Sequence, residues 1–185
     1  MKKSVKKIIC IIISALFIIN NLGFRAEAAR KPINTAITDK SSETNIIIKA
    51  PAVKMGSNTV QMKKKRTCYV KFTAPSSRYY NLAFTPQFTD KQNKSFMLGY
   101  FQINRVVNGS FATEELSTYG GKYIALNIAN KKYVKACKQN CDKAQMYRQK
   151  RNTTIWLEAG ETIYISSYFQ KSTVPTYIKY NLVIK

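Results

Sequence analysis

The chain has 185 residues with 31 Lys or Arg, 9 Asp or Glu and no His, which gives a net charge of +22 at pH 7. The absence of His excludes Ser-His and Cys-His nucleophile pairs and every His-ligated metal site. A surface this basic favours polyanionic partners, although the same excess of Lys is equally consistent with a chain that is merely kept soluble. A length of this order accommodates one domain.

The amino end carries the pattern of a secretory signal peptide. Four lysines lie among the first seven residues, an apolar run follows from Ile8 to Ile19, and Ala26-Glu27-Ala28 offers a cleavage site. The apolar run is shorter than the ~20 residues that span a membrane. We therefore expect a protein that is secreted or associated with the cell surface. Its expected parts are a signal peptide at 1–28, a flexible leader at 29–44 and a single domain at 45–185.

The rest of the chain consists mainly of short segments in which apolar and polar residues alternate, as they do in half-buried strands. We predict some eight strands within the segments 45–49, 68–74, 79–85, 96–107, 123–128, 132–137, 154–158, 161–169 and 176–184. Asn108-Gly109 is a turn signal, and residues 112–116 fit one helical turn. Many short strands without a convincing amphipathic helix predict an all-β fold, an antiparallel β-sandwich or jelly roll.

The clearest alternation lies between Thr153 and Ile165, where two β-patterned segments flank Ala159-Gly160. Gly160 adopts backbone angles that its β-branched neighbours cannot, so we expect it to form the tight connection between the two segments. The apolar faces of the predicted strands define the expected core between two sheets. Its residues are Val70, Phe72, Leu82, Phe84, Ile124, Leu126, Ile155, Leu157, Ile163, Ile165, Leu182 and Ile184.

Three cysteines follow the predicted signal peptide, at positions 68, 137 and 141. In an exported protein they predict one disulfide and one remaining thiol. A bond between Cys137 and Cys141 would close a short loop, whereas a bond from Cys68 to either partner would join two distant strands. A metal site built on three thiols lacks a fourth ligand, so we expect no metal and no cofactor.

Several motifs in the last two thirds of the chain follow one another in a familiar order. They are Val70-Lys-Phe-Thr-Ala-Pro75, Tyr80-Asn-Leu82, the segment 123–128 with Tyr133-Val134, the segment 155–165 and the segment 176–184. This series resembles the bacterial pre-peptidase C-terminal (PPC) domain, a small β-sandwich related to the collagen-binding domains of clostridial collagenases. The resemblance implies the fold. Cys68 and Lys122 stand where the family often has Asp. Calcium binding is not carried over from the collagen-binding relatives, because Asp39 and Glu43 are the only acidic residues between Ala29 and Phe88, too few for a cation that takes six or more oxygens.

The functional signal in the sequence is basic and aromatic. Tyrosine supplies a flat surface with a hydroxyl group, which suits stacking on sugars or on extended peptide. The preference of tyrosine for strands explains any single one equally well. The predicted binding residues are Lys63, Lys64, Lys65, Arg66, Tyr69, Lys131, Lys132, Arg148, Lys150, Arg151, Tyr164 and Tyr177.

These features predict a secreted, non-catalytic binding module that attaches to an extracellular polyanion, a cell-wall glycan or a matrix protein. The alternative is a membrane-active, toxin-like protein that acts on anionic lipid surfaces. An enzyme would have to use Glu158 and Glu161, which we expect at solvated strand ends. No loop has the spacing of a phosphate cradle, and nothing indicates a specific nucleic-acid partner. The sequence leaves the oligomeric state and the disulfide pairing open.

Overall fold

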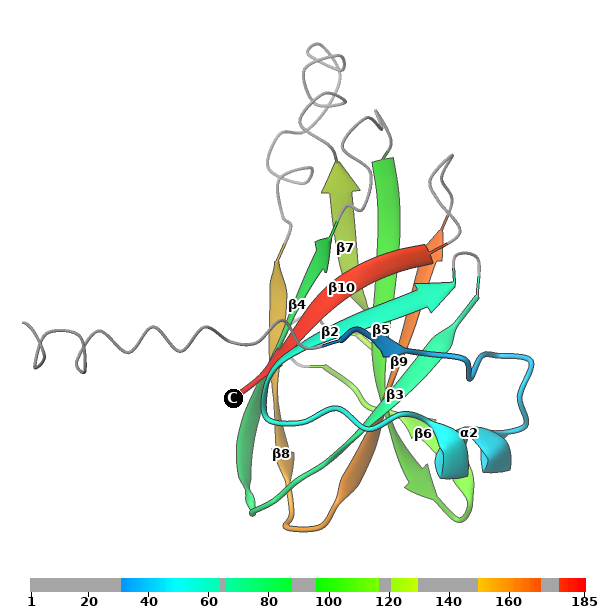
Figure 1. The fold of residues 1–185 in the computed structure, drawn as a ribbon. Helices are drawn as coiled ribbons and strands as arrows, with labels where there is room; N and C mark the ends of the chain where they lie inside the picture. Colours follow the sequence, from blue (N-terminus) through cyan, green and yellow to red (C-terminus); the bar gives the residue numbers. More distant parts are fainter. Residues whose placement is uncertain (1–30, 64–65, 88–95, 117–120, 130–149, 171–176) are drawn as a thin grey trace, which may run out of the picture. The chain divides into compact units, whose positions relative to one another are not determined.

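A computed structural model describes residues 31–63, 66–87, 96–116, 121–129, 150–170 and 177–185. Within these ranges the chain forms two five-stranded sheets and one short helix, arranged as Figure 1 shows. Sheet A contains, in spatial order, β1 (Ile33–Asn34), β2 (Gly56–Lys63), β10 (Tyr177–Ile184), β4 (Arg78–Gln87) and β8 (Arg151–Leu157). Sheet B contains β3 (Cys68–Thr73), β9 (Thr162–Gln170), β5 (Phe96–Val107) and β6 (Ser110–Thr113), with β7 (Ile124–Ala129) also paired to β5. The predicted all-β sandwich is confirmed.

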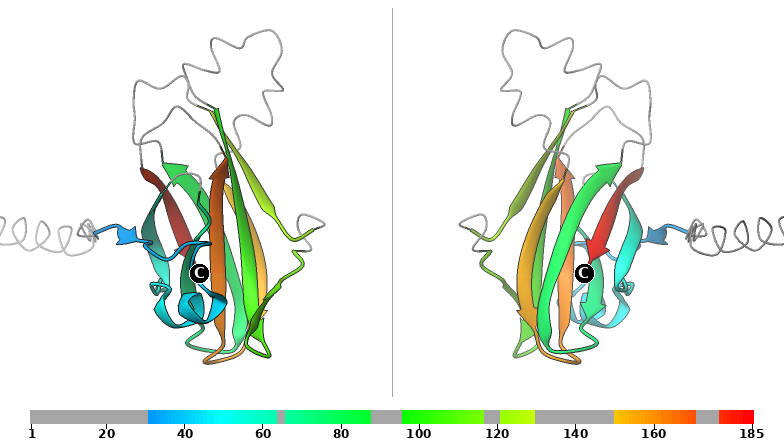
Figure 2. Two further views of the ribbon diagram at one scale, coloured as in Figure 1. Left: turned by 90° about the vertical axis from the view of Figure 1, so that its right-hand side faces the viewer. Right: turned by 90° about the vertical axis from the view of Figure 1, so that its left-hand side faces the viewer.

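The two sheets enclose one apolar core, and Figure 2 shows them as facing layers. Aromatic rings join the layers at its centre: Phe101 of sheet B lies 4.4 Å from Phe84 and 5.0 Å from Tyr180 of sheet A, measured between ring centroids. Each such side chain stabilises the fold by about 1.5–3 kcal/mol through burial. Every predicted core residue whose side chain is described is buried, namely Val70, Phe72, Leu82, Phe84, Ile124, Ile155, Leu157, Ile163, Ile165, Leu182 and Ile184.

The connection around Gly160 carries the chain from one sheet to the other. β8 pairs with β4 in sheet A, whereas β9 pairs with β3 and β5 in sheet B. Gly160 has a φ of 82°, in the region that favours glycine. Its N–H donates to the carbonyl of Ala74 at 2.8 Å, and the N–H of Ala74 donates to the carbonyl of Glu161 at 2.8 Å. The predicted tight connection is therefore a corner between the two layers.

The strand predicted at 45–49 is wrong, because these residues belong to helix α2 (Glu43–Lys49). Ser42 caps the helix by accepting a hydrogen bond from the backbone N–H of Asn45. At the other end, the ammonium group of Lys71 donates to the carbonyls of Ile47 and Ile48, at 3.2 and 2.9 Å. A cation at a helix C-terminus is favourable, so capping and tertiary contacts together override the β propensity of the isoleucine run.

The helical turn predicted at 112–116 is also wrong. The turn at Asn108-Gly109 has positive φ at both residues, 50° and 81°. Such two-residue turns match the twist of a hairpin, so the chain folds back as β6, with Val107 opposite Ser110 and Asn104 opposite Thr113. The backbone pairing with β5 continues beyond β6, where the N–H of Glu114 donates to the carbonyl of Ile103 at 2.8 Å.

Residues that precede the predicted domain boundary lie along the edges of both sheets. β1 pairs in parallel with β2, and the N–H of Thr35 donates to the carbonyl of Gln61 at 3.0 Å. The N–H of Asp39 donates to the carbonyl of Thr67 beside β3, also at 3.0 Å. These contacts cover sheet edges that would otherwise offer unpaired backbone groups.

Some predictions fall outside the described residues. They concern the signal peptide at 1–28, the strand at 132–137 and the cysteines at 137 and 141. Cys68 lies within the described part and is buried. In the ranges that the structure covers, no helix is long and apolar enough to cross a membrane.

Gly99 of β5 provides a test of the core packing. A β-carbon built at this position would lie 2.6 Å from the ring of Phe169, which is itself buried. We expect Gly99→Ala to lower the free energy of unfolding by about 1–3 kcal/mol, because the ring has no free space to move into. Gly121→Ala is the control, since nothing lies within 4 Å of its added carbon. Urea denaturation measures both, and equal stability of the two variants would contradict the packing.

Tyr164 tests the attachment of α2 to sheet B. Its hydroxyl donates to the carbonyl of Ile47 at 3.1 Å. We expect Tyr164→Phe to lower the free energy of unfolding by about 1 kcal/mol, since one largely buried hydrogen bond is lost while Lys71 still reaches the same carbonyl. Tyr79→Phe changes a hydroxyl on an exposed side chain and should leave stability within about 0.5 kcal/mol.

Candidate functional site

The outer face of sheet B carries two cross-strand rows of tyrosine and polar side chains. In the first row Tyr168 of β9 lies opposite Tyr100 of β5. In the second row Ser166 of β9 lies between Tyr69 of β3 and Gln102 of β5. The residues between them in each strand point into the core, because successive side chains of a strand face opposite sides. The core residues therefore fix which side chains face outward.

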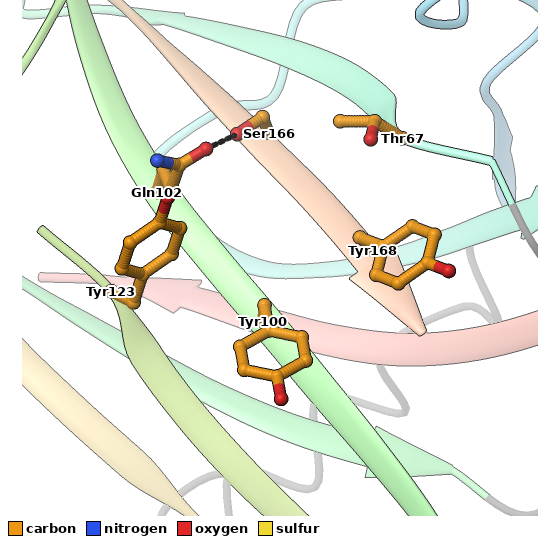
Figure 3. Close-up of a pocket in the computed structure, with 6 residues that line it drawn as sticks. All are labelled: Thr67, Tyr100, Gln102, Tyr123, Ser166 and Tyr168. Carbon is orange, nitrogen blue, oxygen red and sulfur yellow. Dashed lines mark hydrogen bonds between the residues drawn. The ribbon is translucent and has the colours of Figure 1, made fainter. Parts of the chain in front are cut away.

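These rows form an open pocket of about 310 Å³, shown in Figure 3. Its lining is uncharged and consists of Thr67, Tyr100, Gln102, Tyr123, Ser166 and Tyr168. The buried hydroxyl of Ser166 donates to the side-chain oxygen of Gln102 at 3.4 Å. The amide oxygen of Gln102 therefore faces Ser166, and the NH₂ group of the same side chain is a hydrogen-bond donor.

The ring of Tyr100 lies between the other two tyrosine rings of the pocket and contacts each of them. Tyr100 and Tyr168 are stacked with ring centroids 6.5 Å apart and an interplanar angle of 27°. Tyr123, just before β7, meets Tyr100 edge-on at 6.4 Å and is 56% exposed. Aromatic rings that support one another lose little entropy when a flat ligand stacks on them, because few torsions remain to be fixed. The arrangement can hold a flat, partly polar group.

Helix α2 covers the other end of the same face. Tyr164 lies there, only 5% exposed, packed against Ile46 and Phe111. The prediction of Tyr164 as an exposed binding residue is therefore wrong. Its position on the outward side of β9 was predicted correctly, but the helix that covers it was not foreseen.

The predicted basic residues that the structure describes lie in two different sheets. Arg66 is half-buried next to β3 of sheet B. Lys150 is exposed and Arg151 half-buried at the start of β8 in sheet A. Outside the description are residues 64, 65, 131, 132 and 148 and the side chains of Lys63 and Tyr177.

Tyr69 lies in acidic surroundings. Its ring stacks on Phe111 at 5.9 Å. Burial, followed by the charges of Asp39 and Glu43, raises the pKa of its hydroxyl above the ordinary value. Neighbouring carboxylates repel an anion, so the position of Tyr69 does not favour polyanion binding.

The two carboxylates at the β8–β9 corner are both engaged in local contacts. Glu158 accepts hydrogen bonds from the Trp156 indole at 2.9 Å and the Ser77 hydroxyl at 2.8 Å, which lower its pKa below the ordinary value. Glu161 pairs with Arg105 and accepts from the backbone N–H of Glu158 at 2.9 Å. An acid catalyst needs a raised pKa, so these contacts favour a structural role. Among the described residues no group of His, Cys, Asp and Glu could hold a metal ion.

No protein-family model and no curated protein matches the chain. Solved structures that resemble the chain remotely include the following two. Tripeptidyl peptidase 2 has 7% sequence identity and a TM-score of 0.41, and the match covers 72% of this chain but 10% of that one. CorA, described as a surface-associated copper-binding protein of Methylomicrobium album BG8, has 8% identity and a TM-score of 0.39, with 74% and 96% of the two chains covered. Likenesses this remote carry no functional argument.

None of the six pocket residues was among the predicted binding residues, although the sequence carries a signal for several of them. Tyr100 and Gln102 alternate with Phe101 and Ile103, both in the core. Ser166 and Tyr168 alternate in the same way with core positions of β9. Reading the outward faces of these two strands would have selected them. Which of these side chains lie next to one another depends on the pairing of β5 with β9, and the alternation within a strand does not predict that pairing.

The exposure of individual tyrosines can be tested by nitration. Tetranitromethane attacks the ionised phenol, so we expect modification of Tyr79 and Tyr123, which are 68% and 56% exposed. Tyr164 and Tyr180 should stay unmodified in the native protein, because both are buried and burial raises the pKa of each hydroxyl. Peptide mapping by mass spectrometry reads out each site. Rapid nitration of Tyr164 in the folded protein would show that α2 does not cover it.

Proposed function

We propose that the chain is a secreted binding module that attaches to an anionic glycan at a cell surface, with the tyrosine pocket of sheet B as its contact site. The observation that carries this proposal is the pocket itself. In it, Tyr100, Tyr123 and Tyr168 lie beside the polar side chains of Gln102 and Ser166. Protein sites for sugars combine flat aromatic faces with a few well-placed hydrogen-bonding groups.

The charge of the chain supports an anionic polymer as the partner. Without the predicted signal peptide at 1–28 the chain keeps 26 basic and 8 acidic side chains, and this net charge of +18 raises the local concentration of polyanions around the whole molecule. The pocket lining contributes no charge of its own. Arg66 and Lys122, however, are the direct chain neighbours of the lining residues Thr67 and Tyr123. In this proposal the long-range field attracts the polymer, and the pocket selects a sugar ring within it.

Titration with two anionic glycans, heparin and wall teichoic acid, tests the proposal. We expect at least one of the two polymers to bind. Tyr123→Ala and Tyr168→Ala should each weaken this binding about fivefold, because each substitution removes one stacking surface. Raising the salt concentration should weaken binding further, since the attraction is electrostatic. Isothermal titration calorimetry at two salt concentrations provides both measurements.

Tyr79→Ala is the matched control, since it removes an exposed tyrosine from the opposite sheet. It should leave the affinity for the anionic polymer unchanged. Equal weakening by all three substitutions, or none by any, would contradict the assignment to the pocket. Leakage of anionic vesicles without glycan binding would favour the membrane-active alternative.

A further inference from the structure

A second aromatic site lies on the outer face of sheet A, whereas the tyrosine pocket lies on sheet B. Tyr79 of β4 and Trp156 of β8 are cross-strand partners, 68% and 43% exposed. Their rings meet edge to face with centroids 5.0 Å apart. At this distance the rings leave no gap between them for a ligand, but they present a supported aromatic surface to solvent. Exposed aromatic residues that hold one another in place are more typical of binding sites than isolated ones.

Polar groups with fixed orientations border this aromatic pair on two sides. On one side the Glu158 carboxylate accepts from the Trp156 indole and the Ser77 hydroxyl, one bond to each oxygen. A carboxylate offers about four acceptor positions, so about two remain for a ligand. On the other side, in the next cross-strand row, the amide of Asn81 donates to the Thr154 hydroxyl at 3.2 Å.

Arg105 anchors the backbone beneath the site. Its guanidinium donates to the carbonyl of Trp156 at 3.0 Å, and pairs with Glu161 and with Glu114, the latter at 2.8 Å. Glu161 in turn accepts from the N–H of Glu158. The indole and the carboxylate therefore stand on a cross-linked corner, which keeps the site organised before a ligand arrives.

We infer that Tyr79, Trp156 and Glu158 form a second binding site, which takes a neutral sugar ring. The aromatic surface suits the flat, CH-bearing face of a pyranose, and the carboxylate requires a ligand that supplies hydroxyl donors. The Glu158 carboxylate repels an anionic ligand, whereas the net charge of +22 disfavours a cationic one. A neutral polyol with a flat face satisfies both conditions. The inference does not depend on the pocket of sheet B.

The site can be observed directly because Trp156 is the single tryptophan of the chain. Neutral trisaccharides of glucose, galactose, mannose and N-acetylglucosamine are titrated into the full protein, and tryptophan emission is recorded. We expect a saturable change with at least one of them. Sorbitol offers hydroxyls without a flat ring and should give none. The affinity should fall about tenfold in Glu158→Gln, which loses hydrogen bonds to a charged acceptor.

Tyr79→Ala provides a second variant in case Glu158→Gln disturbs the corner, and matching thermal midpoints establish that each variant is folded. Val107→Ala changes an exposed side chain of sheet B that belongs to neither site, and it should leave the response unchanged. The inference is overturned if no trisaccharide gives a saturable response, or if a cationic probe, hexalysine, gives one instead. It is also overturned if both sheet A variants bind as tightly as the native chain. None of these results bears on anionic glycan binding by the sheet B pocket, so the two proposals fail separately.

Discussion

The arrangement of the molecule depends on the contact between the two sheets through the rings of Phe84, Phe101, Phe169 and Tyr180. These rings fix the register of β5 and β9, and with it the face on which every neighbouring side chain lies. A slip of one residue in either strand would turn Tyr100 or Tyr168 into the core and expose an aromatic core residue. The outer tyrosine rows therefore persist because the inner rings leave no other register available.

Helix α2 divides the outer face of sheet B into two parts with different properties. It covers Tyr164 and the Lys71 ammonium, whose hydrogen-bonding capacity is directed to the helix carbonyls. The remaining part of the face keeps Tyr100 and Tyr168 partly accessible. Tyr164 and Tyr168 both lie on the outer side of β9, yet one is buried and the other is partly exposed. The difference arises because α2, which is remote in sequence, covers Tyr164 and not Tyr168.

The core and seven of the ten described strands were predictable from the sequence, because alternation of apolar and polar residues reports burial directly. The prediction missed β1, β2 and β6. The pairing of strands was not predictable. β8 and β9 are adjacent in sequence with a tight connection at Gly160, yet they belong to different sheets. The run Ile46–Ile48 read as a strand because helix capping by Ser42 and the contacts with Lys71 and Tyr164 involve residues outside it. The same holds for the site residues. The alternation of each strand predicts which side chains face outward, but it does not predict which residues lie beside them on the neighbouring strands.

The two aromatic sites differ in what surrounds them, and this difference follows from where the few acidic residues lie. The sheet B pocket has an uncharged lining in a strongly basic chain, so the field at its entrance comes from the protein as a whole. At the sheet A corner, Glu161 is paired with Arg105, and the Glu158 carboxylate, hydrogen-bonded to the Trp156 indole, supplies a local negative charge instead. Local charges act at contact distance, while net charge acts over about a Debye length, roughly 8 Å in physiological salt. The two proposals are therefore physically compatible, because long-range attraction of an anionic polymer does not prevent a neutral ring from contacting Trp156.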